Sequence, residues 1–118
     1  AAVRVDGPDI VLAPKAAIAV AITLHELVTN AVSYGSLSRE TGRVDVWWVA
    51  EPTGSVSLHW AESGGPPVSA PARKGFGTRL IESSVCSDAG GDLTTAYEAA
   101  GLTCEIRLPP ESGRPASA

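Results

Sequence analysis

A long run of apolar and helix-forming residues from Lys15 to Tyr34 dominates the hydrophobic pattern of the chain. Pro14 stands directly before this run, a position that proline favours at the start of helices. Gly35 follows the run, and glycine commonly ends helices in this way. Apolar side chains cover most of the circumference, so the pattern predicts a largely buried helix. These positions are Ile18, Ile22, Leu24, Leu27, Val28, Ala31 and Val32.

The other apolar segments are short and are separated by Gly, Pro and Asp, which favours strands joined by turns. A second amphipathic helix is expected over residues 78–89, where it ends before Gly90 and Gly91. The expected strands are two short pieces within 3–12, a hairpin of 44–50 with 55–62, and a hairpin of 92–98 with 102–108.

Strands in hairpins with helices inserted between them predict an α+β fold. We expect a two-layer α/β sandwich with a mainly antiparallel or mixed five-stranded sheet, covered on one face by about three helices. One domain should occupy residues 1–110. Residues 111–118 are polar and contain Pro and Gly, so we expect them to form a disordered tail.

The composition is that of a soluble globular domain, with 44% hydrophobic and 19% charged residues. The net charge of -4 argues against a nucleic-acid partner, because nucleic-acid-binding surfaces are usually basic. Two cysteines and two histidines form no spacing typical of a zinc site.

The first candidate for chemistry is the polar pair Glu26 and Asn30 on the long helix. Residues four apart lie on one helix face, so the two side chains are neighbours. An amide oxygen is a suitable ligand for Mg²⁺, and a carboxylate can hold one of the waters of the ion or accept a proton. A solvated strip on an otherwise buried helix explains this pair equally well.

The second candidate is Glu62 at the end of a predicted strand. Strand alternation places Glu62 on the same face as Trp60, so the carboxylate points toward the core layer. Such a carboxylate can accept a hydrogen bond from an exocyclic amine such as that of adenine. Gly64 and Gly65 follow and let the backbone approach a ligand closely. Taken alone, this segment is better explained as an exposed turn.

The third candidate is the turn containing Gly75 and Gly77 before the second helix. Backbone N–H groups at a helix N-terminus suit a phosphate, and the cations Arg73, Lys74 and Arg79 lie around the turn. The motif is neither a Rossmann fingerprint nor a Walker A loop.

In this order, the three motifs resemble the boxes of the Bergerat-fold (GHKL) ATPases, and specifically of the HWE class of histidine kinases. The resemblance covers residues 3–109. The residues that carry it are His25, Glu26, Asn30, Ala31, Tyr34 and Gly35 (N box), Trp60, Glu62, Gly64, Gly65 and Pro66 (G1 box), and Gly75, Phe76, Gly77 and Leu80 (G2 box).

The resemblance implies ATP and Mg²⁺ as cofactors. Asn30 would coordinate Mg²⁺, Glu26 would hold a metal-bound water or act as the base, and Glu62 would bind the adenine amino group. The implied ATP contacts are His25, Asn30, Ser33, Tyr34, Glu62, Gly64, Gly65, Arg73, Lys74, Gly75, Phe76, Gly77, Thr78 and Leu80. Ser33 stands where related kinases often have a basic residue, so that phosphate contact is either missing or supplied by Arg73, Lys74 or Arg79. Residues 67–74 would form a short ATP lid.

The implied function is transfer of the ATP γ-phosphoryl group to a histidine on a separate upstream dimerisation domain. The expected partners are that domain and a response regulator. The parent protein is expected to be dimeric, either soluble or membrane-anchored, with this domain in the cytoplasm. Neither His25 nor His59 is a credible phosphoacceptor, so the isolated chain should not autophosphorylate. The alternatives are a non-catalytic ATP-binding signalling module and a serine-kinase anti-sigma-factor-like protein of the same fold.

Overall fold

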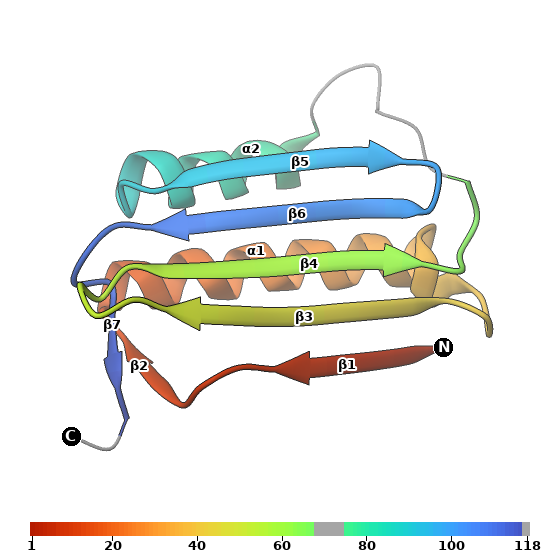
Figure 1. The fold of residues 1–118 in the computed structure, drawn as a ribbon. Coiled ribbons are helices and arrows are strands. Elements are labelled where there is room, and N and C mark those ends of the chain that lie inside the picture. Colours follow the sequence, from red (N-terminus) through yellow and green to blue (C-terminus); the bar gives the residue numbers. More distant parts are fainter. Residues whose placement is uncertain (68–74, 117–118) are drawn as a thin grey trace.

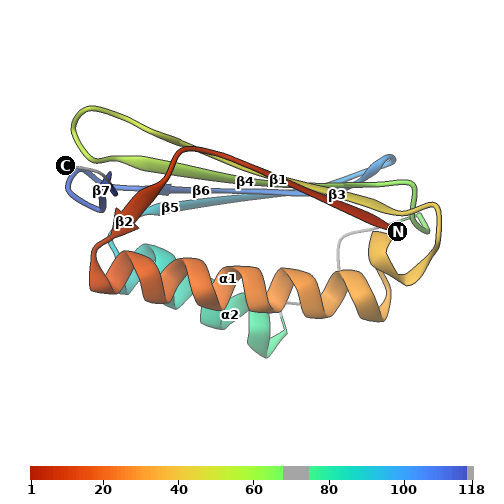
Figure 2. The same ribbon diagram turned by 90° about the horizontal axis from the view of Figure 1, so that it is seen from below.

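The computed structural model describes residues 1–67 and 75–116, which form two layers, a sheet and a layer of helices (Figure 1; Figure 2). The helices are α1 (Pro14–Ser33) and α2 (Phe76–Glu82), with a 3-10 turn η1 (Ser36–Ser38) and a π-helical turn η2 (Ser83–Asp88) that prolongs α2. The strands are β1 (Ala2–Asp6), β2 (Ile10–Leu12), β3 (Arg43–Ala50), β4 (Val56–Ser63), β5 (Asp92–Glu98), β6 (Gly101–Leu108) and β7 (Gly113–Pro115).

The main sheet has the strand order β1-β3-β4-β6-β5. β1 pairs with β3 in parallel, whereas the three other pairs are antiparallel. Figure 2 shows α1 and α2 together on one face of this sheet. The five-stranded, mixed two-layer sandwich expected from the sequence is therefore confirmed.

The core lies between the sheet and α1, and small residues on the helix bring the two layers together. Ala19 and Ala31 have no exposed surface, and they face strand residues such as Val44 and Ile106, which are 0% and 1% exposed. Thr23, also buried, donates its hydroxyl hydrogen bond to the carbonyl oxygen of Ala19 at 2.7 Å. A helix packed this closely holds its neighbouring polar side chains at fixed positions beside the sheet.

The expectation that α1 is largely buried is wrong. Ile18 and Val32 are each 56% exposed, and Val28 is 43% exposed. The structure describes two α-helices where about three were expected, and they leave part of the sheet uncovered. Val3 and Val5 of β1 pair with core positions of β3, yet they are 58% and 61% exposed.

An apolar cavity of about 780 Å³ lies on this uncovered side of α1. Its lining includes Val5, Leu24, Val28 and Trp48, so residues of α1, β1 and β3 contribute to it. Hydrophobic periodicity alone cannot distinguish a helix surrounded by protein from one whose apolar side borders such a cavity.

The expected disordered tail contains a strand. Residues Gly113–Pro115 form β7, which pairs antiparallel with β2. β2 does not belong to the main sheet, and its backbone groups pair with β7 instead. Residues 117–118 lie outside the described part of the chain.

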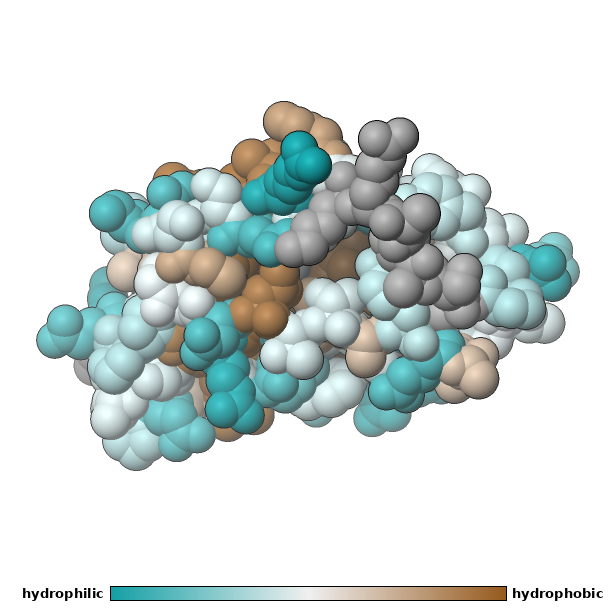
Figure 3. All heavy atoms as spheres, turned by 90° about the horizontal axis from the view of Figure 1, so that it is seen from above, coloured by the Kyte–Doolittle hydropathy of each residue, from teal (hydrophilic) through white to brown (hydrophobic). Residues whose placement is uncertain are grey.

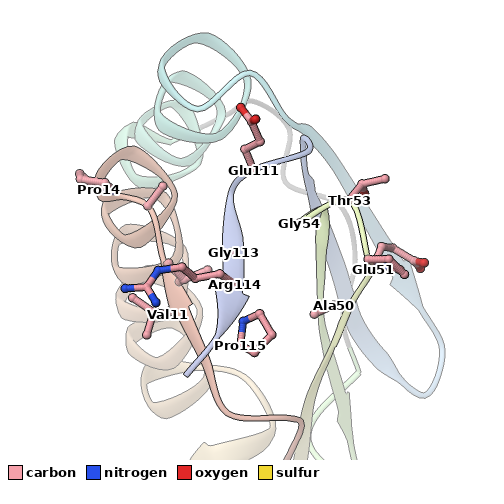
Figure 4. A pocket seen from close by; sticks show the side chains of 13 residues that line it. Val11, Pro14, Ala50, Glu51, Thr53, Gly54, Glu111, Gly113, Arg114 and Pro115 are labelled. Carbon is pink, nitrogen blue, oxygen red and sulfur yellow. The ribbon is translucent and has the colours of Figure 1, made fainter. Parts of the chain in front are cut away.

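A second cavity, of about 830 Å³, opens between the β2–β7 pair and the β3–β4 turn (Figure 4). It is lined by residues such as Val11, Pro14, Glu51 and Arg114. Pro14 begins α1, so this cavity lies about 24 Å along the helix from Asn30. It is therefore separate from the predicted N box.

Replacing Ile106 tests the core assignment. Ile106→Ala should lower the free energy of unfolding by about 2–5 kcal/mol, because it leaves a cavity in a closely packed layer. Val49→Ala on β3, where the side chain is 48% exposed, is the control and should cost less than about 1 kcal/mol. Urea denaturation of both variants measures the difference, and equal losses would contradict the assignment.

Candidate functional site

Three polar residues of the predicted N box form one row on α1. Glu26, Asn30 and Tyr34 are spaced by four residues, and the first two are half-buried. The Tyr34 hydroxyl donates a hydrogen bond to Asn30 Oδ1 at 2.8 Å. The structure therefore brings these side chains together at the end of α1 that leads into η1.

The N-terminal turn of α2 lies directly against this row. A Cβ atom added at Gly77 would overlap the carboxylate of Glu26, so only glycine leaves room for that side chain. A Cβ atom at Gly75 would have nothing within 4 Å. α2 begins at Phe76, two residues before the expected Thr78, which places Gly77 in its first turn. The predicted N and G2 boxes are thus in contact.

Glu62 is a buried carboxylate with two hydrogen-bond donors. It is 5% exposed at the end of β4. Its Oε2 accepts a bond from the indole N–H of Trp60 at 2.9 Å, and its Oε1 accepts one from the backbone N–H of Ser36 at 3.0 Å. These two bonds offset part of the cost of removing the charge from water.

The pairing of Trp60 with Glu62 gives a physical reason for their spacing. Residues two apart on a strand project from the same face, so the indole N–H can reach the carboxylate. Strand alternation predicts that both side chains lie on one face, but it does not reveal the hydrogen bond between them. The signal for this hydrogen bond in the sequence was a carboxylate expected to be buried two residues after a tryptophan on the same strand face.

Gly35 has a different role from the helix-ending one expected from the sequence. Its φ angle is -101°, which is not left-handed, and the C-cap of α1 is Tyr34. A Cβ atom at Gly35 would lie 2.6 Å from Glu62 Oε1 and 2.9 Å from Ala31 Cα. Glycine is therefore needed here because the carboxylate and the helix approach so closely.

The Gly64–Gly65 turn is fixed to the same region. Thr41 donates its hydroxyl hydrogen bond to the carbonyl oxygen of Gly64 at 2.7 Å. Gly65 lies against the backbone of Ser36, the residue whose N–H binds Glu62. The turn after β4, η1 and the buried carboxylate consequently form one unit.

The other predicted contacts lie at the surface or outside the described residues. His25 and Ser33, two of the predicted ATP contacts, are exposed on α1. Thr78 is half-buried. Arg73 and Lys74 belong to the segment 68–74, which the structure does not describe.

Large apolar side chains gather near α2 and β5. Figure 3 views the molecule from this side and shows brown, hydrophobic atoms in the middle of a mostly hydrophilic surface. The exposed large hydrophobic residues of α2 and β5 are Phe76 (81%), Leu80 (42%) and Tyr97 (40%). The surface beside the predicted G2 box is therefore both apolar and accessible.

The electrostatic field of the row is negative. Burial first, and then the carboxylate of Glu26, raise the pKa of the Tyr34 phenol, and Tyr97 and Glu62 act in the same direction. The phenol therefore stays protonated at neutral pH. Among the described residues, no group of three or more His, Cys, Asp or Glu side chains could hold a metal ion by itself. A cation here would need further ligands, such as phosphate oxygens.

Replacing Trp60 tests the hydrogen bond to Glu62. Trp60→Phe should lower the free energy of unfolding by about 1–3 kcal/mol, because a buried carboxylate oxygen loses its donor. In a Glu62→Leu background the same change should cost clearly less, since no carboxylate then needs the indole. Urea denaturation of the wild type, the two single variants and the double variant gives the coupling free energy between Trp60 and Glu62. Equal costs in both backgrounds would mean that packing alone accounts for Trp60.

No protein-family model matches the chain. Curated relatives include blue-light-activated histidine kinase 1 of Erythrobacter litoralis, which is 44% identical over 91% of this chain. The blue-light-activated histidine kinase of Brucella ovis is 36% identical over the same share. The chain spans only 30% and 22% of the lengths of these two relatives.

Solved structures with the same fold are also histidine kinases. The Erythrobacter litoralis EL346 blue-light-activated histidine kinase superposes on 92% of this chain with a TM-score of 0.77 and 18% identity, and 35% of that chain is covered. The mycobacterial sensor histidine kinase MprB superposes on 96% with a TM-score of 0.68 and 20% identity, and 82% of that chain is covered. The chain is therefore a relative of the blue-light-activated histidine kinases that has the fold of a histidine kinase catalytic domain.

Proposed function

We propose that this chain is the ATP-binding catalytic domain of a two-component sensor histidine kinase. It would transfer the ATP γ-phosphoryl group to a histidine on a separate dimerisation domain. The main support is the convergence at one end of α1 of the Glu26–Asn30 row, the Gly77 turn and the buried Glu62. The sequence relationship to histidine kinases adds independent support.

Glu62 is proposed to bind the adenine amino group. Each carboxylate oxygen can accept more than one hydrogen bond. The bonds from Trp60 and Ser36 use one position on each oxygen, so capacity remains for an exocyclic amine. Because those two donors fix the carboxylate, a ligand with a matching N–H would meet it in a preset orientation.

Asn30 and Glu26 are proposed to hold the Mg²⁺ that accompanies ATP, with Glu26 acting through water or as the base. An amide oxygen with one nearby carboxylate fits an ion that keeps several waters and shares its ligands with phosphates. When bound, Mg²⁺ would neutralise charge on the phosphates. The Gly75–Thr78 turn, with Arg79 and the cations at 73 and 74, is proposed to contact the phosphates.

The proposed partners follow from the same role. The relatives are about three to five times as long as the matched segment, so their remaining residues can supply other domains. We propose an upstream dimerisation and phosphoacceptor domain, a response regulator and a dimeric parent protein. We also propose that the domain lies in the cytoplasm, where ATP is supplied, whether the parent is soluble or membrane-anchored.

A second candidate is an ATP-binding module that signals without phosphoryl transfer. It is favoured by Ser33, which stands where related kinases often carry a basic residue. A weaker hold on the phosphates would reduce transfer more than it would reduce nucleotide binding.

Calorimetric titration with a non-hydrolysable ATP analogue tests the nucleotide site. Asn30→Ala should abolish the enhancement of affinity by Mg²⁺. Glu62→Gln should weaken binding at least about tenfold, because a carboxamide cannot accept as strongly and presents its own N–H. Glu105→Gln removes a carboxylate from the opposite face of the sheet and is the matched control. An affinity that none of the changes alters would place the nucleotide elsewhere.

Phosphoryl transfer separates the two candidate functions. With ATP and Mg²⁺, the isolated chain should form no acid-labile phosphohistidine. Addition of a histidine kinase dimerisation domain should yield phosphohistidine on that domain. Labelling of the isolated chain would contradict the proposal, whereas binding without any transfer would favour the signalling module.

A further inference from the structure

Tyr34 covers the proposed metal-binding oxygen. The residue caps the C-terminus of α1 with φ -152°, outside the helical region. Its hydroxyl nevertheless reaches back one turn and donates to Asn30 Oδ1 at 2.8 Å. With 67% of its surface exposed, Tyr34 has little packing that would determine this position. The hydrogen bond to Asn30 is therefore a main constraint on the side chain.

A phenolic proton and a metal ion need the same feature of Asn30. The carboxamide has one oxygen, and its other terminal atom is an NH₂ group that cannot coordinate a cation. A hydroxyl that donates to Oδ1 points its positive end at a lone pair of that oxygen. Mg²⁺ draws on the same electron density and requires close to ideal octahedral geometry. The two interactions therefore oppose each other.

A phenol keeps its proton at neutral pH, so the Tyr34 hydroxyl acts as a donor to Asn30 Oδ1. Glu26 lies against the Gly77 turn, one helical turn from Asn30 on the other side. Asn30 thus lies between a carboxylate, which would attract a cation, and a hydroxyl whose proton already binds Oδ1.

We propose that Tyr34 is a positioning residue that holds Asn30 Oδ1 in the nucleotide-free protein and competes with Mg²⁺ for it. This inference rests on the proposed role of Asn30 as a metal ligand. The carboxamide oxygen keeps a second lone pair, but the hydrogen bond draws electron density from the oxygen and fixes its direction, so Mg²⁺ binds more strongly once Tyr34 releases it. The exposed ring can turn away from Asn30 into solvent without opening the core. Tyr34 thereby sets the Mg²⁺ concentration at which the domain loads its nucleotide.

The test is Tyr34→Phe, which keeps the ring and removes only the hydroxyl. Calorimetry with the non-hydrolysable ATP analogue over a series of Mg²⁺ concentrations gives the affinity without metal and the Mg²⁺ midpoint. The midpoint should fall about two- to tenfold, the factor that corresponds to one ordinary hydrogen bond. The affinity for the analogue without metal should change by less than about twofold, a margin well below one hydrogen bond.

Two controls isolate the effect. In an Asn30→Ala background, which should no longer respond to Mg²⁺, Tyr34→Phe should not restore any dependence on Mg²⁺, because the contested oxygen is gone. Tyr97→Phe removes the phenolic hydroxyl of another exposed tyrosine that has no bond to Asn30 among those described, and it should leave the midpoint unchanged.

The outcomes distinguish this inference from the proposed function. An unchanged or higher midpoint in Tyr34→Phe, while the wild-type chain binds with Mg²⁺ and Asn30→Ala does not respond to it, overturns the role of Tyr34 alone. Equal losses of affinity with and without metal would also overturn it, because the hydroxyl would then contact the nucleotide. Wild-type binding that does not depend on Mg²⁺, or no binding, overturns both proposals.

Discussion

The candidate site depends on one constraint, the burial of the Glu62 carboxylate. A charge that is 5% exposed is tolerated only with donors in place, and two different parts of the chain supply them. The indole of Trp60 comes from the same strand, and the backbone N–H of Ser36 comes from the turn after α1. Since Gly35 must leave room for the carboxylate, the end of the helix, the turn and the strand are fixed relative to one another.

The second determinant is the close contact between α1 and the sheet. Alanines at positions 16, 19 and 31 let the helix approach the strands. The polar row of Glu26, Asn30 and Tyr34 then lies at the border of the core. Glu26 contacts α2, and Tyr34 is exposed to solvent. The same packing explains why Gly77 meets Glu26. A site made of facing helices and a strand end is therefore a consequence of how the two layers pack.

In the nucleotide-free protein, the polar side chains of this site accept hydrogen bonds from other groups of the protein. Asn30 is hydrogen-bonded by Tyr34, and Glu62 by Trp60 and Ser36. The two cases differ physically. The donors to Glu62 are buried, whereas the donor to Asn30 is exposed and can leave. In our proposal the Glu62 end of the site is preorganised for its ligand, and the Asn30 end loses its bond to Tyr34 when Mg²⁺ binds.

Local pattern by itself determined the main elements and the candidate residues. Helical periodicity gave α1, alternation gave the two hairpins, and the order of the three boxes identified Glu26, Asn30, Glu62 and the Gly75–Gly77 turn. These features depend on residues close together in the chain. The same holds for the two-layer sandwich, because strands in hairpins with amphipathic helices between them allow few other arrangements.

Tertiary structure decided what depends on residues distant in sequence. Only packing shows that β1 is parallel to β3, that the end of the chain pairs with β2, and that one side of α1 remains exposed. The role of Gly35 changed for the same reason, since its neighbour Glu62 is far along the chain. The hydrogen bond of Tyr34 to Asn30 is local in sequence, but the helical pattern could not reveal it. It joins the helix to its C-cap residue, whose φ of -152° lies outside the helical region that the pattern describes.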